Sequence, residues 1–400
     1  MRRVAITGAG SINALGNGVE AFESGLRAAS CAIGTISLFD STGYRSTCAA
    51  EVAGLRAPAW LPKPIARRTS RSDVLALIAA REALESAGLE GAASELGLVV
   101  AATTGGMHAS EEYLRRSLLA LPAARPAAIL TTPVSASTDL LAGLLGCEGP
   151  RLTVSTACSS GANALGIASD WIRGGRAEAV LCGGVDSLCR MTFSGFNALQ
   201  ALDAVPCRPF DRRRAGLSLG EGAAMFVFED RERALARGAT VLAEFLGYGI
   251  SADAHHITQP RPDGAGALLA MQRALDDSGV VAEELDYVNA HGTATPLNDV
   301  LETRAIKALC GAHAYRIPVS STKSMVGHCL AAAGAIEALA CVLALRGGFV
   351  PATATLEQPD PECDLDYVPR VSRTQTLRTA LSNSYGFGGN NTALVLRRAE

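Results

Sequence analysis

The sequence predicts an α/β fold with mostly parallel, buried strands. Three observations lead to this prediction: short apolar runs typical of strands, longer segments with apolar residues at helical spacing between them, and glycine-rich turns where several strands end. The chain has 400 residues, of which 48% are hydrophobic and 5% aromatic. It is therefore long enough for one large domain or two ordinary ones, with helices packed tightly on sheets.

Each predicted element has a local signal. Strands are predicted where apolar and β-branched residues cluster, at residues 4–7, 98–102, 152–155, 179–182, 224–229, 241–247, 287–290, 318–321, 380–382 and 392–397. Helices are predicted at residues 72–87, 162–173, 265–278 and 300–310, and the first three of them end at a glycine. A break near residue 246 divides the chain into residues 1–245 and 246–400. No repeat is visible between these two parts.

Composition excludes several classes of function. The net charge of −3 gives no global basis for binding nucleic acid. The eleven cysteines stand alone, without CxxC pairs or metal-ligand spacing, so we expect free thiols in a reducing cytoplasm and neither a metal nor a cofactor. Gly8 and Gly10 lack the third glycine of a dinucleotide-binding turn, because Asn13 occupies that position. The apolar segment 329–345 contains Glu337, which favours a buried core helix over a membrane span.

Cys158 is the candidate nucleophile. It lies in the segment Ser-Thr-Ala-Cys-Ser-Ser-Gly, residues 155–161, between a strand-like run and a predicted helix. A cysteine at a helix N-terminus is surrounded by free N–H groups and the positive end of the helix dipole, which favour a reactive thiolate. The alternative is a structural cysteine packed in the core.

Three further segments carry candidate site residues at predicted strand ends. Residues 289–299 place His291 directly after a strand, residues 320–328 contain Lys323 and His328, and residues 383–391 form a glycine-rich turn around Phe387. A histidine alone in such a place is more often a core residue, and a lysine alone is most often a solvated surface charge. Together with Cys158 they indicate a site for nucleophilic catalysis.

These motifs resemble those of the elongating 3-ketoacyl-acyl-carrier-protein synthases, condensing enzymes with the thiolase fold. The segments TACSSG, HGTATP, SSTKSxxGH and GFGG occur in that family's order and spacing, and the resemblance spans essentially the whole chain. It implies two similar halves stacked in five layers, α-β-α-β-α. Residues 1–245 would carry the cysteine, and residues 246–400 would carry both histidines.

The resemblance also implies a reaction. Cys158 would accept an acyl group from a carrier-protein thioester, with the N–H groups of Cys158 and Phe387 as oxyanion hole. Malonyl-acyl-carrier protein would then lose CO2, and its enolate would extend the acyl chain by two carbons. His291 and His328 would donate hydrogen bonds from Nε2 to the enolate oxygen.

Further roles are implied around this core. Lys323 would orient the second histidine, and Asp299 and Glu337 would hold the lysine. Gly386 and Gly388 would let Phe387 swing as a gate, although a plain tight turn is the alternative. A basic patch would dock the acidic carrier protein, with candidates Arg67, Arg68, Arg71 and Arg125. Arg212, Arg213 and Arg214 are either further docking residues or a solvated charge run.

Departures from the family pattern bear on the substrate. Thr104 stands where relatives often have a bulky aliphatic residue in the acyl pocket, the loop 198–210 is short, and the last turn ends in Asn390-Asn391. Ordinary fatty-acid elongation and a specialised polyene or polyketide pathway both remain open. So do a homodimer and the active half of a heterodimer with a chain-length-factor-like partner. A thiolase-type acyltransferase is disfavoured, because its second cysteine is missing from the GFGG turn.

Overall fold

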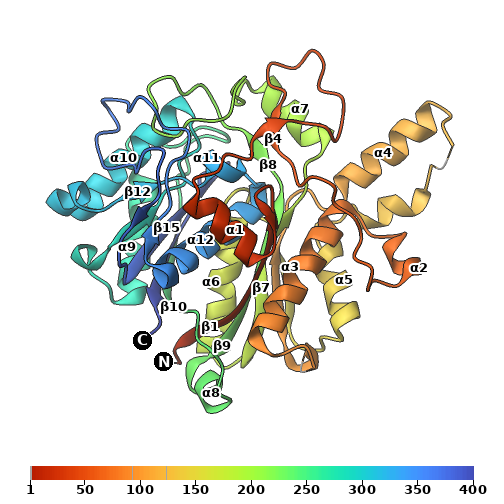
Figure 1. Cartoon of the computed structure of the whole chain (residues 1–400), viewed down its shortest axis with the longest axis horizontal. Helices are drawn as coiled ribbons and strands as arrows, with labels where there is room; N and C mark the ends of the chain where they lie inside the picture. The colour runs from red at the N-terminus through yellow and green to blue at the C-terminus, as the bar shows by residue number, and fades with distance from the viewer. Residues whose placement is uncertain (1, 92, 123) are drawn as a thin grey trace.

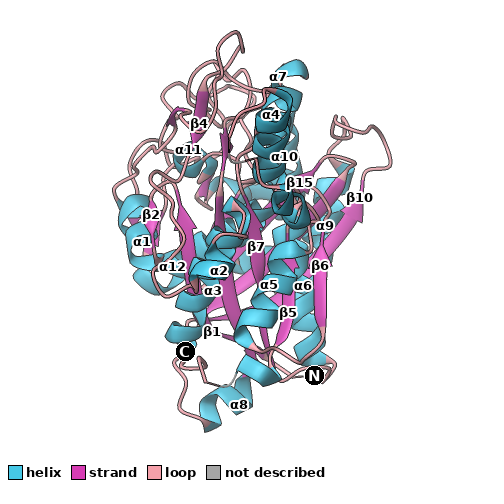
Figure 2. Ribbon diagram, turned by 90° about the vertical axis from the view of Figure 1, so that its right-hand side faces the viewer, coloured by secondary structure: helices cyan, strands magenta, loops and turns pink. Residues whose placement is uncertain are grey.

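The computed structural model describes residues 2–91, 93–122 and 124–400 (Figure 1). A large mixed sheet runs through the molecule, with helices on both of its faces (Figure 2). One half of the sheet has the strand order β6 (Arg151–Val154), β5 (Gly97–Ala101), β7 (Ala179–Asp186), β9 (Gly222–Asp230), β1 (Val4–Asn13). The other half has the order β12 (Val319–Ser320), β11 (Tyr287–Asn289), β15 (Thr379–Gly386), β16 (Asn390–Arg398), β10 (Ala243–Ala252).

The two halves of the sheet have the same topology. In each half, the first three strands of the order are parallel to one another, and each of the last two is antiparallel to the strand before it. The strands of the two halves also follow one another in the same order along the chain. The halves join where residues 4–6 of β1 pair with residues 243–245 of β10. The duplication is therefore visible in the strand pairing, although the sequence shows no repeat, because topology persists when side chains differ. The division of the chain at residue 246 stays a prediction.

Helices complete the five layers. The outer layer of the first half contains α3 (Arg71–Ala87) and α5 (Ala136–Leu145), and that of the second half contains α9 (Ala265–Ser278) and α10 (Pro296–Cys310). Between the two half-sheets lie α6 (Ser160–Arg173) and α12 (Ala333–Gly347), which pack on each other and on strands of both halves. The predicted five-layer fold is confirmed.

The remaining elements lie at the edges of these layers. The short helices are α1 (Val19–Arg27), α2 (Lys63–Ala66), α4 (Met107–Leu118), α7 (Arg190–Ala198), α8 (Arg231–Ala236) and α11 (Lys323–Val326). The 3-10 turns are η1 (Ala93–Glu95), η2 (Pro126–Thr131), η3 (Ala282–Glu284), η4 (Gly311–Tyr315) and η5 (Leu330–Ala332). The minor strands are β2 (Gly16–Asn17), β3 (Gly34–Thr35), β4 (Cys48–Ala50), β8 (Leu219–Gly220), β13 (Phe349–Val350) and β14 (Arg373–Thr374). In Figure 1, α4 and α2 project from the side that carries the first half.

Local sequence explains why the layers pack closely. Ser70 and Asp73 form a capping box that starts α3, and Gly88 ends it in the left-handed conformation, at φ 65°. A side chain at Gly10 of β1 would place its Cβ 2.1 Å from the carbonyl oxygen of Ala79 on α3. Glycine there serves helix-on-strand packing, not nucleotide binding.

Helix α12 confirms the prediction of a core helix. The segment Leu330–Gly347 is apolar and long enough to cross a membrane, but 89% of its residues are buried inside the protein. Its surroundings are α6 and the two half-sheets, so its apolar side chains pack in the middle layer on every side.

Candidate active site

Cys158 lies in a strained turn between β6 and α6. The preceding Ala157 has φ 54°, a left-handed conformation that a side chain rarely adopts. The hydroxyl of Ser160 holds the turn, because it accepts the N–H of Thr156 at 2.7 Å and donates to the carbonyl of Ala157 at 2.5 Å. Such strain persists only where surrounding contacts fix it, as at functional sites.

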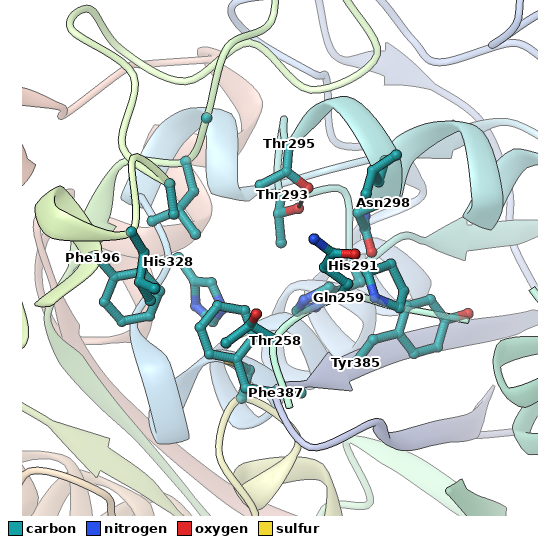
Figure 3. Close-up of a pocket in the computed structure, with 18 of the residues that line it drawn as sticks. Phe196, Thr258, Gln259, His291, Thr293, Thr295, Asn298, His328, Tyr385 and Phe387 are labelled. Carbon is teal, nitrogen blue, oxygen red and sulfur yellow. Dashed lines mark hydrogen bonds between the residues drawn. The ribbon is translucent and has the colours of Figure 1, made fainter. Parts of the chain in front are cut away.

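The two histidines meet beside this turn. His291 follows β11, and His328 precedes the helical segment that leads into α12. Their rings lie 5.4 Å apart at 86°, and both side chains line one cavity of about 350 Å³ together with Cys158 and Phe387 (Figure 3). The duplicated fold accounts for this meeting. Cys158 precedes α6 as His328 precedes α12, and both of these helices lie in the middle layer.

Hydrogen bonds set the tautomer of each histidine. Lys323 Nζ lies 3.2 Å from Nδ1 of His291, and the N–H of Leu330 donates to Nδ1 of His328 at 3.1 Å. A lysine ammonium and a backbone N–H are donors only, so each Nδ1 accepts and each neutral ring carries its proton on Nε2. Burial, then the charge of Lys323, holds the pKa of both imidazoles well below the ordinary value of 6.5. Both rings are therefore neutral donors at pH 7.

Lys323 is placed differently from the prediction. Its ammonium contacts His291, the first histidine, and not His328. Glu337 of α12 forms a fully buried ion pair with it, as expected. Asp299 does not contact the lysine: its carboxylate accepts the N–H groups of Phe210 at 2.7 Å and Ala294 at 3.1 Å. Asp299 faces the segment around Phe210 because it lies in the first turn of α10, on the outer layer.

Glu302 was missed by the sequence analysis. Its buried carboxylate accepts the N–H groups of His291 and Gly292, both at 2.8 Å, and the amide of Asn383 at 3.1 Å. It therefore fixes the turn that carries the first histidine. The available signal was its spacing, since Glu302 follows Asp299 by three residues and so lies on the same face of one helix.

Phe387 lines the cavity together with the cysteine. Its backbone N–H acts to lower the pKa of the Cys158 thiol, and its ring stacks on Phe196 of α7 with centroids 5.5 Å apart at 22° (Figure 3). Gly388 has φ 84°, and a side chain at Gly386 would place its Cβ 3.0 Å from the carbonyl of Thr156. The left-handed φ thus favours glycine at 388, and the turn leaves little room for a side chain at 386. The gating role of Phe387 stays a prediction.

The thiolate expected at Cys158 is not favoured at neutral pH. Burial raises the pKa of the thiol to about 11, although the charge of Lys323 and the N–H of Phe387 act in the opposite direction. The sulfur is buried between the layers, so loss of hydration outweighs its position near a helix N-terminus. The resting site therefore holds a thiol.

Alkylation of Cys158 should reflect this raised pKa. Only the thiolate reacts with iodoacetamide, so the rate should rise about tenfold per pH unit between pH 7 and 9. Peptide mass spectrometry resolves Cys158 from the other ten cysteines. A rate that levels off below pH 8 would contradict the raised pKa.

Thr104 is not among the residues that line the cavity with Cys158, and its role in an acyl pocket stays a prediction. Its side chain is buried, and its hydroxyl donates to Asp186 at 2.8 Å. The turn after β5 directs this side chain toward the end of β7. There the hydrogen bond to the Asp186 carboxylate compensates the cost of burying the hydroxyl.

The predicted docking arginines separate into two groups. Arg67, Arg68 and Arg125 are exposed and line one groove of about 380 Å³. Arg71 is mostly buried and donates to Glu221 at 2.7 Å, so it stabilises the fold and does not belong to the surface patch. Arg213 and Arg214 are paired with neighbouring acids, whereas Arg212 is exposed and donates to Gln358.

The class of protein that this arrangement and the family matches define is an enzyme that transfers acyl groups. Residues 1–234 match the family described as beta-ketoacyl synthase, N-terminal domain, and residues 242–357 match beta-ketoacyl synthase, C-terminal domain. The chain belongs to the beta-ketoacyl synthase family.

Individual relatives agree over the whole length. The chain is 41% identical to 3-oxoacyl-[acyl-carrier-protein] synthase 2 of Synechocystis, covering 99% of this chain and 98% of the relative. It is 42% identical to nodulation protein E of Rhizobium meliloti, covering 99% of both. Among solved structures it is similar to the ishigamide ketosynthase/chain length factor, with a TM-score of 0.94 and 37% identity over 100% of both chains.

Proposed function

We propose that the protein condenses a Cys158-bound acyl chain with malonyl-acyl-carrier protein and so lengthens the chain by two carbons. One observation carries this proposal. Two neutral histidines, each with its proton on Nε2, line the cavity that contains the cysteine. Such a pair can stabilise an enolate oxygen without a metal ion.

In the first half-reaction, Cys158 Sγ attacks the carbonyl of an acyl-carrier-protein thioester. A new carbon–sulfur bond forms, the bond to the carrier sulfur breaks, and the thiol proton leaves with the carrier thiol. The N–H groups of Cys158 and Phe387 stabilise the charge on the carbonyl oxygen. Phe387 is suited to this because its N–H already acts to lower the pKa of the Cys158 thiol in the resting site.

In the second half-reaction, malonyl-acyl-carrier protein loses CO2. The electron pair of the broken bond forms an enolate, whose oxygen accepts hydrogen bonds from Nε2 of His291 and His328. The enolate carbon attacks the acyl carbonyl, the bond to Cys158 breaks, and the sulfur takes up one proton. Lys323 and Glu302 position His291 for this step through Nδ1 and the backbone N–H.

A condensation assay tests this proposal. The purified protein is incubated with a panel of acyl-carrier-protein thioesters and malonyl-acyl-carrier protein, and 3-ketoacyl products are identified by mass spectrometry. We expect products two carbons longer than the donor. The preferred donor distinguishes fatty-acid elongation from a specialised polyene or polyketide pathway. The absence of product with every donor, with and without a partner subunit, would contradict the proposal.

The carrier protein is proposed to dock at the groove that contains Arg67, Arg68 and Arg125. These three cations are exposed side by side in one concave surface, which suits an acidic partner. Replacing Arg67 and Arg68 together by glutamate should raise KM for the acyl-carrier protein about tenfold, with a weaker salt dependence. Steady-state kinetics at two ionic strengths measure the effect. Arg212→Glu is the control, and an equal effect there would place docking elsewhere.

The protein is further proposed to act in the cytoplasm as a dimer, with an identical chain or a related ketosynthase-like subunit. Free thiols support the location. Exposed leucines support the dimer, since Leu118 and Leu130 are 84% and 77% exposed. In the part of the chain that the structure describes, β6 is the strand at one edge of the sheet, where a second chain could pair. Mass photometry of the protein alone and with a co-expressed partner distinguishes the two kinds of dimer.

A further inference from the structure

Asp186 is a buried carboxylate outside the cavity. It ends β7 in the middle of the molecule, and its side chain is fully buried. It accepts the N–H groups of Thr103 at 3.0 Å, Thr104 at 2.8 Å and Ala331 at 2.8 Å, and the hydroxyls of both threonines. All five donors are neutral. The carboxylate therefore joins the end of β5 to the segment that follows His328.

The contact between Asp186 and Ala331 lies three residues after the second histidine, His328. Between them are Cys329 and Leu330, and Leu330 has φ 51°, in the left-handed region. A branched side chain is strained there, so the conformation persists only when neighbouring contacts fix it. Two consecutive N–H groups provide these contacts: that of Leu330 binds Nδ1 of His328, and that of Ala331 binds Asp186.

This geometry gives Asp186 a role in the chemistry. If Ala331 were released, the turn of residues 329–331 could rearrange, and the N–H of Leu330 would no longer be held against Nδ1 of His328. The proton of the imidazole would then be free to occupy Nδ1, and Nε2 would no longer be a donor. His328 Nε2 has no hydrogen-bond partner among the described residues, so the substrate oxygen is free to accept from it.

We propose that Asp186 is a positioning residue for the decarboxylation step, which holds the Leu330–Ala331 turn and thereby keeps the Nε2 proton of His328 directed to the substrate. Thr104 belongs to this network as a donor to Asp186. The inference rests on the proposed condensation reaction. It separates the two half-reactions, because Asp186 forms no hydrogen bond with the Cys158 turn among the described residues, and its charge raises the pKa of the Cys158 thiol less than burial does.

The test is Asp186→Asn, which keeps the shape but leaves one acceptor oxygen for five donors. Acylation of Cys158, followed by intact mass, should stay within about threefold of wild type. The kcat of condensation and the rate of malonyl-carrier decarboxylation should fall about 10- to 100-fold, with KM for the malonyl carrier little changed. Asp286→Asn is the matched control, since that carboxylate also accepts backbone N–H groups, those of Arg378 and Thr379, in another part of the fold.

A double variant with His328→Ala distinguishes a positioning role of Asp186 from a general structural effect. In a His328→Ala background, Asp186→Asn should change decarboxylation by less than about twofold, because its effect passes through that histidine. If Asp186→Asn does not fold, Asp186→Glu is used, since it keeps the charge but displaces the oxygens by one methylene. Equal losses in acylation and condensation, or additive effects with His328→Ala, would overturn the inference. A wild-type protein that neither accepts an acyl group nor condenses would overturn the proposed function and this inference with it.

Discussion

His291→Ala and His328→Ala should each lower condensation about 10²- to 10³-fold while leaving acyl transfer to Cys158 largely intact. Each substitution removes one Nε2–H donor from the position where the enolate charge develops, and one oxyanion donor in a desolvated site typically contributes that factor. Neither imidazole forms a hydrogen bond with the cysteine sulfur among the described residues, and each Nδ1 is held by another donor. The first half-reaction therefore does not depend on them.

Separate assays of the two half-reactions check this expectation. Intact mass after incubation with an acyl-carrier protein reports acylation, and product analysis with malonyl-acyl-carrier protein reports condensation. Tyr385→Phe is a suitable control, because its ring packs 5.5 Å from that of His291 and only its hydroxyl is removed. If either histidine variant lost acylation and condensation to the same extent, the histidines would belong to the first step as well.

Lys323→Met should destabilise the fold by about 3–5 kcal/mol and also remove condensation. The side chains of Lys323 and Glu337 are 1% and 2% exposed, so the substitution would leave a buried carboxylate without its counter-charge. It would also remove the donor to Nδ1 of His291, and with it the fixed tautomer of that ring. Urea unfolding monitored by circular dichroism measures the change in the free energy of unfolding.

Two comparisons make the lysine experiment decisive. Adding Glu337→Gln to Lys323→Met should restore part of the lost stability but not the activity, because the buried charge is gone while His291 still lacks its donor. Lys307→Met removes a lysine from an ion pair with Asp364 at the surface, whose side chains are 30% and 41% exposed, and should cost at most about 1 kcal/mol. A similar small cost for Lys323→Met would show that the pair does not hold the site together.

The candidate site was predictable where its signal is local in sequence. Cys158, His291 and His328 each lie in a short motif beside a strand or helix end, and the fold brings these ends together. The contacts between motifs were not predictable in the same way. Which histidine Lys323 contacts and the burial of Arg71 against Glu221 depend on how segments far apart in the sequence meet, which no single segment encodes.

The fold was predictable as a class and less so in detail. Alternating strands and helices indicate an α/β protein, and the apolar run of α12 indicates a core helix. The duplication became visible only in the strand pairing. The raised pKa of the Cys158 thiol illustrates the same limit. The helix N-terminus, which favours the thiolate, can be recognised in the local sequence, whereas burial by the surrounding layers, which raises the pKa, cannot.

The most direct test of the account is the intact mass of the wild-type protein after incubation with an acyl-carrier-protein thioester, followed by addition of malonyl-acyl-carrier protein. The account predicts one acyl adduct on the Cys158 peptide, absent from the Cys158→Ala variant, which disappears as a product two carbons longer is released. An adduct on another residue, or an adduct that persists when malonyl-acyl-carrier protein is added, would contradict a condensing site centred on Cys158.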